Sequence, residues 1–342
     1  MANLSRVEPI SVENTPEDEY LDNTLRPKTW DEYVGQSKLK EGLKVIIDAA
    51  KKRGQSPDHL LFYGGSGLGK TTLSHLVANE MGANIRVTSG PAIERAGDLA
   101  AILTNLNDGD VLFIDELHRL NRVCEETIYP AMEEFKLNMI LGKGPMARTM
   151  ELKLPHFTLV GATTRMALLS SPLRNRFGAT FQLNFYDPSD IEQIVKRSAE
   201  ILGVAIEPSA SRLIAECSRF TPRVANRLLK RVRDFAQVAG KNVIDKESAQ
   251  KALTFMEVDQ VGLEPGDRRV LQAIIEKFEG GPVGLQALAA VIGDEQDTIL
   301  DIYEPYLMQM GFIERTSRGR VATKLAYEHL GIKYRNPQNG LL

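Results

Sequence analysis

The feature that most constrains the fold of this 342-residue chain is the run GGSGLGKT at residues 64–71, which matches the phosphate-binding P-loop pattern. An apolar run, Leu60 to Tyr63, precedes it, and a helical pattern with Leu73, Leu76 and Val77 follows it. A chance glycine-rich turn before Lys-Thr is the alternative, but such a turn requires neither a strand before it nor a helix after it. The segment therefore predicts a nucleotide site at the end of a strand.

The residues of this segment are expected to share the binding of phosphate. Glycines let successive backbone N–H groups turn toward the phosphates, and the helix start adds the positive end of its dipole. Lys70 is expected to reach the outer phosphates, and Thr71 to hold a magnesium ion. The residues that we expect to contact ATP here are Gly67, Gly69, Lys70, Thr71 and Thr72.

Two further apolar runs end in polar residues and are predicted to be strands of the same sheet. Val111 to Ile114 leads to Asp115, assigned to Mg²⁺ binding, and to Glu116, assigned to polarising the attacking water. Paired acids can instead be helix N-caps, although the upstream P-loop argues against that alternative. Phe157 to Val160 leads to residues 163–165, where a threonine could sense the γ-phosphate or hold the water.

Arginines in two other segments are candidates for phosphate contacts. Arg174 and Arg176 have no acidic neighbour in sequence, which suits a finger inserted into the ATP site of an adjoining subunit. That interpretation implies a ring or a filament, and ordinary surface arginines are the alternative. In Thr221-Pro222-Arg223 the threonine is a predicted helix N-cap, so Arg223 falls in the first turn. A nucleotide phosphate shared with the helix end would explain a cation there.

The chain is too long for one hydrophobic core, and its patterns predict three domains between two tails. Residues 1–20 are polar and are predicted to be a disordered tail, and residues 337–342 form a second tail. Residues 21–186 alternate strands with helices, which is typical of an α/β fold with a parallel sheet. Residues 187–259 carry only amphipathic helices, and residues 260–336 predict three helices and a hairpin, as in a winged-helix domain. The predicted helices in these two domains are Ile191 to Leu202, Ala210 to Cys217, Arg223 to Val238, Leu271 to Phe278, Leu285 to Ile292 and Ile299 to Met310.

Composition limits the classes of function. The net charge of −3 excludes a protein that coats nucleic acid through its whole field, so any DNA contact must be a local patch. No apolar run approaches the roughly 20 residues that a membrane span needs, and we expect no membrane contact and a cytoplasmic location. Cys124 and Cys217 lack metal-ligand spacing and are expected to be buried fillers.

Two predicted β-hairpins carry candidate contact surfaces. In residues 136–154 apolar residues alternate on both sides of a turn at residues 142–145, and Met150 and Leu152 are candidates for binding a partner. Packing of this hairpin on the core is the alternative. Between Phe312 and Lys324, Arg315 and Arg320 are expected at polar strand positions within reach of DNA phosphates. A merely solvated charged hairpin is the alternative.

Together these motifs resemble those of the RuvB family of AAA+ ATPases, from about residue 20 to residue 335. The segments that carry the resemblance are Leu25-Arg26-Pro27, Tyr33-Val34-Gly35-Gln36, the P-loop, Asp115-Glu116-Leu117-His118-Arg119, Gly161-Ala162-Thr163-Thr164-Arg165 and Gly280-Gly281-Pro282-Val283-Gly284-Leu285. The resemblance implies an AAA+ P-loop core, a small helical lid domain and a C-terminal winged-helix domain. It also implies a homo-hexameric ring around duplex DNA that hydrolyses ATP with Mg²⁺ and drives branch migration at Holliday junctions, with RuvA and RuvC as partners.

The resemblance also assigns roles to matching residues. Leu25, Arg26 and Tyr186 would line the adenine side, and Glu133, Glu134 and Phe135 would lie near the nucleotide. Thr163 would be the first sensor and Arg223 the second, and Arg176 rather than Arg174 would be the finger because it directly precedes Phe-Gly. The resemblance further favours docking of the RuvA C-terminal domain on the hairpin of residues 136–154, and DNA contacts by Arg315 and Arg320.

Two departures from the family pattern bear on this assignment. Gly64-Gly65-Ser66-Gly67 replaces the usual Gly-Pro-Pro-Gly, and Phe220 replaces a glycine before Thr-Pro-Arg, which leaves the geometry of the second sensor open. A clamp loader is a rival interpretation, but its usual Ser-Arg-Cys finger context is absent. A second rival is an ATP-gated DNA-binding regulator in which turnover is incidental.

Overall fold

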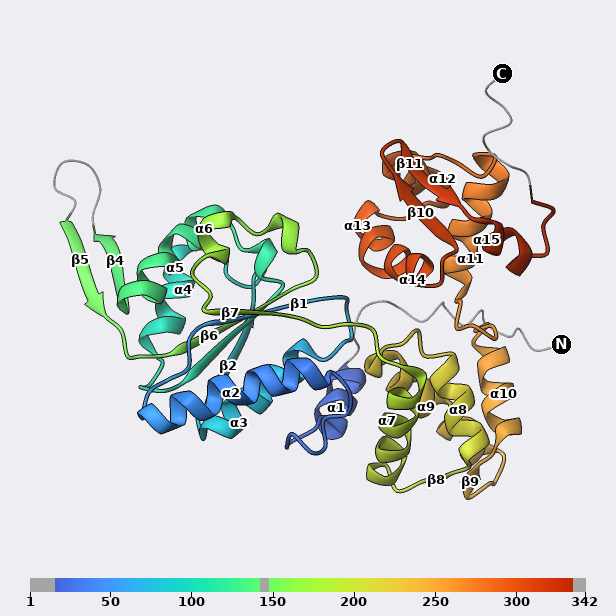
Figure 1. Cartoon of the computed structure of the whole chain (residues 1–342), viewed down its shortest axis with the longest axis horizontal. Helices are drawn as coiled ribbons and strands as arrows, with labels where there is room; N and C mark the ends of the chain where they lie inside the picture. Colours follow the sequence, from blue (N-terminus) through green and yellow to red (C-terminus); the bar gives the residue numbers. More distant parts are fainter. Residues whose placement is uncertain (1–15, 142–147, 335–342) are drawn as a thin grey trace. The chain divides into compact units, whose positions relative to one another are not determined.

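The computed structural model describes residues 16–141 and 148–334, and they form two compact units. One unit is residues 26–185, and the other joins residues up to 25 to those from 186 onward (Figure 1). Within the described ranges, no helix has both the length and the apolar character needed to cross a membrane.

A five-stranded parallel sheet lies at the centre of residues 26–185, as expected for an α/β fold. Its order is β2 (Ile85–Ser89), β3 (Val111–Asp115), β6 (Thr158–Thr163), β1 (Leu60–Tyr63) and β7 (Ala179–Gln182). The three inner strands are buried on both faces, which explains why their sequences are continuous apolar runs. The three predicted strands are confirmed, with β6 extending further than predicted, to Thr163.

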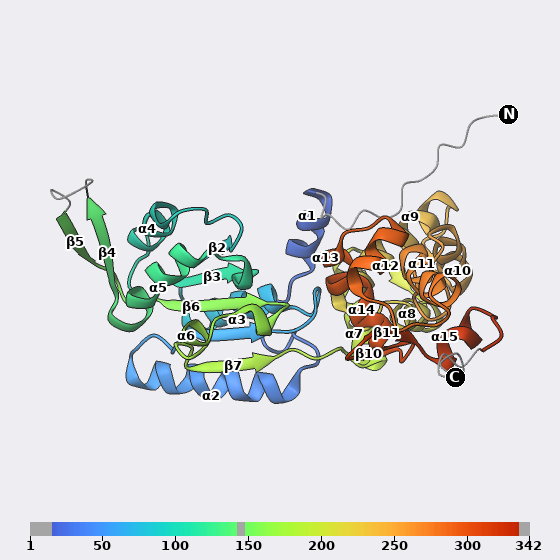
Figure 2. The same ribbon diagram turned by 90° about the horizontal axis from the view of Figure 1, so that it is seen from above.

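Helices cover both faces of this sheet (Figure 2). They are α2 (Ser37–Arg53), α3 (Lys70–Met81), α4 (Ala96–Thr104), α5 (Arg122–Glu134) and the short α6 (Ser171–Arg174), with 3-10 turns η1 (Leu117–Arg119) and η3 (Met166–Leu168). On one face Leu61, Leu112 and Leu159 pack against Leu103 of α4 and Ile128 of α5. Helices α2 and α3 contact each other on the other face. The P-loop follows β1 directly, at the carboxyl end of the strands β1, β3 and β6.

Side-chain caps fix where two of these helices begin. The Asn121 side chain accepts a hydrogen bond from the Cys124 backbone N–H at 2.9 Å and starts α5. The Ser170 side chain accepts one from the Leu173 N–H at 3.2 Å and starts α6. Such caps satisfy backbone N–H donors that the helix cannot satisfy itself. They therefore fix the residue at which α5 and α6 each begin.

The predicted hairpin of residues 136–154 is confirmed as two antiparallel strands, β4 (Lys136–Leu141) and β5 (Arg148–Lys153). Its predicted turn lies outside the described residues. Leu137 and Leu154 are buried in the core, and Leu152 packs partly against it. Met150 is 39% exposed. The core alternative therefore applies to the base of the hairpin, including Leu152, and the exposed candidate for partner binding is Met150.

In the second unit, one helix from the N-terminal segment joins four helices that follow residue 186. They are α1 (Pro16–Leu25), α7 (Pro188–Ile201), α8 (Pro208–Glu216), α9 (Pro222–Val238) and α10 (Lys246–Phe255), with two short paired strands, β8 (Ala205–Ile206) and β9 (Val243–Ile244). Residues 16–20, expected in a disordered tail, are helical because they belong to α1, which packs against α7 and α9 and buries Leu21 and Leu25. The three helices predicted in this region are confirmed, each beginning one to three residues earlier than predicted.

The C-terminal part has the predicted three helices and hairpin. Its elements are α11 (Pro265–Gln272), the π-helical turn η4 (Ala273–Lys277), α12 (Leu285–Ile292), α13 (Gln296–Thr298), the π-helical turn η5 (Ile299–Tyr303), α14 (Glu304–Gln309), β10 (Ile313–Thr316), β11 (Gly319–Ala322) and α15 (Lys324–His329). The third predicted helix is built from α13, η5 and α14 in succession, and α15 follows the hairpin. Leu271, Leu288, Leu307 and Tyr327 belong to the shared core.

A buried arginine ties the helices of residues 186–259 to the winged helix. Arg219 donates to the Asp267 carboxylate at 3.1 Å and to the Ile302 carbonyl at 2.8 Å, and its guanidinium lies 4.7 Å from the centre of the Tyr306 ring. Asp267 is fully buried, and burial raises its pKa to about 6 despite the neighbouring Arg219. Breaking a buried pair of this kind leaves an uncompensated charge, so these contacts hold the two parts together firmly.

Candidate nucleotide and DNA sites

The P-loop lies between β1 and α3, where the sequence predicts it. A Cβ on Gly64 would lie 2.5 Å from the Leu183 carbonyl oxygen, so a larger residue does not fit. Gly69 caps α3 with a φ of 99°, in the left-handed region that favours glycine. Lys70 begins the helix and is 7% exposed, and its Nζ donates to the carbonyls of Gly64 at 2.9 Å and Gly65 at 2.7 Å. The carbonyls of the loop therefore hold the Lys70 ammonium against the loop.

The two predicted acids lie at the end of β3, beside this loop. Asp115 Oδ2 is 3.5 Å from the Thr71 hydroxyl, and Asp115 Oδ1 accepts from the Glu116 backbone N–H at 2.8 Å. Glu116 has a φ of 48°, and its carboxylate, which is 45% exposed, accepts from Arg119 at 3.0 Å. The hydroxyl and carboxylate oxygens of Thr71 and Asp115 are hard ligands that meet at one point, while the Glu116 carboxylate reaches solvent.

Thr163 ends β6 at the same edge of the sheet. It is fully buried, its hydroxyl lies 3.0 Å from His118 Nδ1, and that hydroxyl accepts from the Arg165 backbone N–H at 3.0 Å. Its carbonyl accepts from the Gly64 N–H at 3.2 Å, which ties β6 to the P-loop. We call Lys70, Thr71, Asp115, Glu116 and Thr163 the P-loop edge. His118 was not predicted as a site residue because its contact with Thr163 depends on pairing across strands.

Arg176 lies at the opposite edge of the sheet, where the parallel strands have their amino ends. It precedes Gly178, whose N–H donates to the His59 carbonyl at 2.9 Å, just before β1 begins. Arg176 forms an ion pair with Glu133 at 3.1 Å and donates to the Pro172 carbonyl at 2.7 Å. Arg176 has no acidic neighbour in sequence, but in the fold α5 brings Glu133 next to it. Arg174 bonds instead to the Ser171 hydroxyl, at 3.1 Å.

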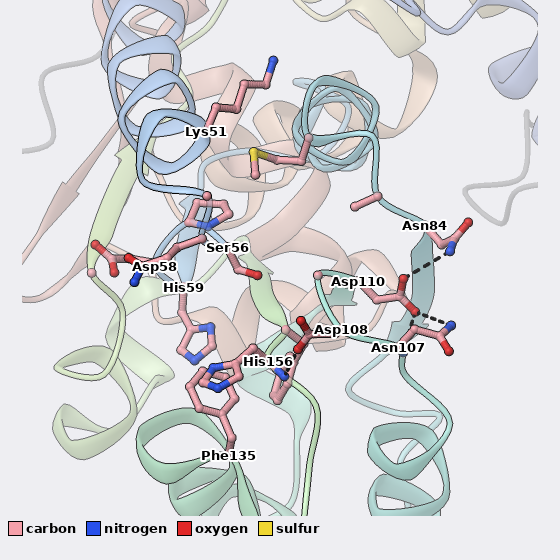
Figure 3. A pocket seen from close by; sticks show the side chains of 18 of the residues that line it. Lys51, Ser56, Asp58, His59, Asn84, Asn107, Asp108, Asp110, Phe135 and His156 are labelled. Atoms are coloured by element: carbon pink, nitrogen blue, oxygen red, sulfur yellow. Dashed lines mark hydrogen bonds between the residues drawn. The ribbon is translucent and has the colours of Figure 1, made fainter.

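A pocket of about 1000 Å³ lies at this second edge, and Arg176 and Phe135 are among the residues that line it (Figure 3). His59 is also in its wall, but both ring nitrogens are bonded, to the Leu159 N–H at 2.9 Å and the Met132 carbonyl at 3.0 Å. Burial lowers the pKa of His59, so it braces the strand ends as a neutral ring. Glu133, Glu134 and Phe135 end α5 here, away from the P-loop of their own chain.

Arg26 and Leu25 fall in different units. Arg26 Nη1 is 2.8 Å from Nε2 of His75, which belongs to α3. Burial, followed by the charge of Arg26, lowers the pKa of His75 to about 4, so the neutral ring accepts from the guanidinium. Leu25 is buried at the end of α1, and its carbonyl accepts from Arg197 at 2.9 Å.

Tyr186 and Arg223 both lie near the start of α9, where the sequence predicts a helix to begin. Thr221 is the N-cap of α9 and Pro222 its first residue, as predicted. Arg223 pairs at 3.4 Å with Asp22 of α1, so a carboxylate is the anion found beside this arginine. Phe220 has a φ of 57°, which explains why glycine suits its position, and its carbonyl accepts from the Tyr186 N–H at 3.0 Å.

The two arginines predicted to contact DNA differ in exposure. They lie opposite each other on β10 and β11, and Glu304 of α14 pairs with both, at 3.1 Å from Arg315 and 3.0 Å from Arg320. The Arg320 side chain is only 10% exposed, whereas that of Arg315 is 53% exposed. Arg320 lies on β11 opposite Arg315, as predicted, but its guanidinium is turned inward to the buried Glu304 carboxylate, so Arg315 is the more exposed of the two. Two facing cations need such an anion, and Glu304 supplies it.

Comparison with known proteins agrees with this geometry. Family models match residues 25–183 as the "Holliday junction DNA helicase RuvB P-loop domain", residues 186–259 as the "RuvB AAA lid domain" and residues 260–331 as the "RuvB C-terminal winged helix domain". The chain belongs to the RuvB family. As the family implies, it combines an AAA+ P-loop core, a helical lid and a winged helix.

Individual RuvB proteins match nearly the whole chain. The "Holliday junction branch migration complex subunit RuvB" of Dehalococcoides mccartyi is 59% identical over 330 residues, covering 96% of this chain and 95% of its own. That of Chloroflexus aurantiacus is 57% identical over 325 residues, covering 95% and 93%. A structure of the Thermotoga maritima RuvB Holliday junction branch migration motor is 48% identical, with a TM-score of 0.84 over 91% of this chain and 100% of that one.

Proposed function

We propose that this RuvB-family chain is the ATP-hydrolysing motor subunit that drives branch migration at Holliday junctions in DNA recombination and repair. The observation that carries the proposal is the P-loop edge, where a lysine, two acids and two threonines surround one helix start in a chain that also holds a winged helix. Its relatives are subunits of the Holliday junction branch migration complex by name, which supports the junction as substrate. A regulator that merely binds ATP would not need Glu116 beside the P-loop.

The donor set at the P-loop edge fits Mg²⁺. The Thr71 hydroxyl and the Asp115 carboxylate, 3.5 Å apart, would hold the ion. When bound, Mg²⁺ neutralises charge on the β- and γ-phosphates. Lys70 would neutralise the outer phosphates, and the backbone N–H groups of the turn and of the start of α3, from Gly67 to Thr72, would donate to the phosphate oxygens.

Hydrolysis requires a water oxygen to attack the γ-phosphorus while the bond to ADP breaks. Glu116 takes the proton of that water, and its hydrogen bond to Arg119 directs the carboxylate within the mouth of the site. We assign the Thr163 hydroxyl, which accepts from the Arg165 N–H, to a hydrogen bond with the γ-phosphate or the water. These roles require only groups that β1, β3 and β6 bring to one edge.

Arg176 lies at the wrong edge to serve the P-loop of its own chain, so we assign it to the nucleotide of an adjoining copy. Glu133, Glu134 and Phe135 end α5 beside Arg176 and are assigned to the same contact. A contact between two different faces of identical chains repeats around a ring when its rotation closes. We therefore propose a homo-oligomeric ring, with the hexamer implied by the family.

Mixed assemblies test the intersubunit site. Arg176→Ala subunits lack the finger and Lys70→Ala subunits lack the phosphate charge partner, so each alone is expected to lose about 10³-fold or more of its ATPase rate. Mixing them brings an intact finger to an intact P-loop and is expected to restore part of the rate. The matched control Arg174→Ala should stay near the parental rate. If no ratio of the two inactive variants restores turnover, Arg176 does not act on an adjoining chain.

The remaining nucleotide assignments rest on the family resemblance. We assign Leu25, Arg26 and Tyr186 to the adenine side and Arg223 to the second sensor. The position of Arg223 in the first turn of α9 supports its assignment, since an anion is favoured there. In this assignment the nucleotide phosphate competes with Asp22 for the guanidinium.

DNA and partner contacts are assigned to the two hairpins. We propose that Arg315, the more exposed arginine of the wing, contacts the backbone of duplex DNA. We also propose that the hairpin of β4 and β5 docks the C-terminal domain of RuvA through the exposed Met150. RuvC is a further expected partner, and the cytoplasm is the expected location.

A further inference from the structure

One face of α5 points toward the segment that carries Arg176. Glu125, Tyr129 and Glu133 are spaced four residues apart, so they form a single stripe along the helix. The guanidinium of Arg176 lies over the Tyr129 ring, 4.1 Å from its centre. Glu133, at the end of the stripe, supplies the ion pair at 3.1 Å. Two of the three residues therefore contact Arg176 directly, and the third, Glu125, bonds to Ser170 in the segment before it.

Hydrogen bonds of its hydroxyl hold the Tyr129 ring in place, and we call these bonds its brace. Its hydroxyl donates to the Glu125 carboxylate, which also accepts from the Ser170 hydroxyl, and the two hydroxyl oxygens are 3.3 Å apart. Ser170 caps the short helix α6, which leads directly to Arg176. Burial and then the bond to Glu125 raise the pKa of Tyr129, so the hydroxyl remains a donor. The ring is thus fixed to the helix start that positions the arginine.

Glu133 holds Arg176 in a different way. The carboxylate is 55% exposed, and its 3.1 Å approach to Arg176 Nε lacks the alignment of a hydrogen bond. A poorly aligned ion pair whose carboxylate is open to solvent contributes little to stability, so this carboxylate can be exchanged for another anion. A ring face, in contrast, contacts the flat side of a guanidinium and leaves for an anion those in-plane N–H donors that are not already bonded, as Arg176 Nη1 is to the Pro172 carbonyl.

We propose that Tyr129 is a positioning residue for Arg176, setting the direction in which the guanidinium enters the adjoining ATP site. Glu133 is the partner that the guanidinium exchanges for phosphate. This inference rests on the proposed role of Arg176 between subunits. Tyr129 also packs against the core of the domain, so a test must separate positioning from packing.

Two substitutions of Tyr129 make that separation. Tyr129→Met fills the space with a flexible apolar side chain but removes the ring, so kcat for ATP should fall about tenfold or more, since small displacements of a catalytic group have effects of this order. Tyr129→Phe keeps the ring and loses only the hydroxyl, so it should retain most of the activity. KM for ATP should stay unchanged in both, because the P-loop of each chain is intact. If kcat falls as far in Tyr129→Phe as in Tyr129→Met, the ring of Tyr129 does not position Arg176.

Mixing with Lys70→Ala subunits gives a readout that a packing defect would not produce. Tyr129→Met subunits have an intact P-loop, so intact fingers from Lys70→Ala subunits should restore turnover above that of either variant alone. The Arg176→Ala and Lys70→Ala mixture is the reference. Restoration in the reference but not with Tyr129→Met would reject the inference while sparing the proposed function. A reference mixture that stays inactive would reject the intersubunit role of Arg176 itself.

A second variant guards against misfolding of Tyr129→Met. Glu125→Ala leaves the ring and the Ser170 cap of α6 in place but removes the carboxylate that holds the Tyr129 hydroxyl. It should lower kcat by about threefold, with the same recovery in mixtures, because the ring can then tilt under the guanidinium. Parental kcat in this variant, with the same midpoint of thermal unfolding as the parent, would show that the brace has no part in positioning.

Discussion

The two edges of the parallel sheet are built in different ways. At the P-loop edge, Lys70, Asp115 and Thr163 are placed by the backbone, because each adjoins the end of a strand or the start of a helix. At the other edge, Arg176 is placed by side chains from a different helix, Tyr129 and Glu133. Groups fixed by backbone are suited to a reaction within one chain. A group held by exchangeable side-chain contacts is suited to reach another chain.

The largest expected effect tests the backbone-placed edge. Glu116→Gln keeps the size and hydrogen bonding of the side chain but cannot accept the proton of water, so kcat should fall by about 10³-fold. Binding of a fluorescent ATP analogue should stay within about twofold of the parental affinity, because the phosphate contacts come from the P-loop. Glu126→Gln, on the exposed face of α5, is the matched control. A parental rate in Glu116→Gln would remove this residue from the chemistry.

A smaller effect is expected at the first hairpin, where exposure differs along one strand. Met150→Asp places a charge on an exposed position and should weaken binding of RuvA by about tenfold or more, with the ATPase rate in the absence of RuvA unchanged. Leu152→Asp places a charge against the core and should lower the midpoint of thermal unfolding instead. Titration of RuvA followed by calorimetry, with a melting curve for each variant, measures both. Unaltered RuvA affinity in Met150→Asp would exclude this hairpin as the docking surface.

The smallest effect on binding is expected at the wing, where two facing arginines share one carboxylate. Arg315→Ala should weaken duplex binding several-fold on any sequence and lower the slope of log K against log salt by about one. Arg320→Ala should leave that slope nearly unchanged but cost about 3 kcal/mol of unfolding free energy, since Glu304 then loses a buried partner. Isotherms at several salt concentrations on two unrelated duplexes, with denaturant unfolding of each variant, give both quantities. Equal changes in slope for the two arginines would mean that Arg320 also reaches phosphate.

The same contrast explains how much could be predicted from the sequence. The P-loop, β1, β3 and the positions of Asp115 and Thr163 follow from local patterns, because a strand end and a helix start are defined by neighbouring residues. The burial of Arg320 could not be predicted, since it depends on Glu304, 16 residues away and on a helix. The partner of Arg176 was missed for the same reason. The stripe of Glu125, Tyr129 and Glu133 is visible as a four-residue spacing, but nothing local indicates which arginine it faces.

The buried Arg219 has a mechanical consequence. It immediately precedes Phe220 and the first turn of α9, which carries Arg223, while its guanidinium is bound to Asp267, Ile302 and the Tyr306 ring of the winged helix. We therefore expect a rotation imposed at that turn to move the helices that carry Asp267, Ile302 and Tyr306 with it. We expect the helices of residues 186–259 and the winged helix to move as one rigid body, so that the hairpin that bears Arg315 moves with α9.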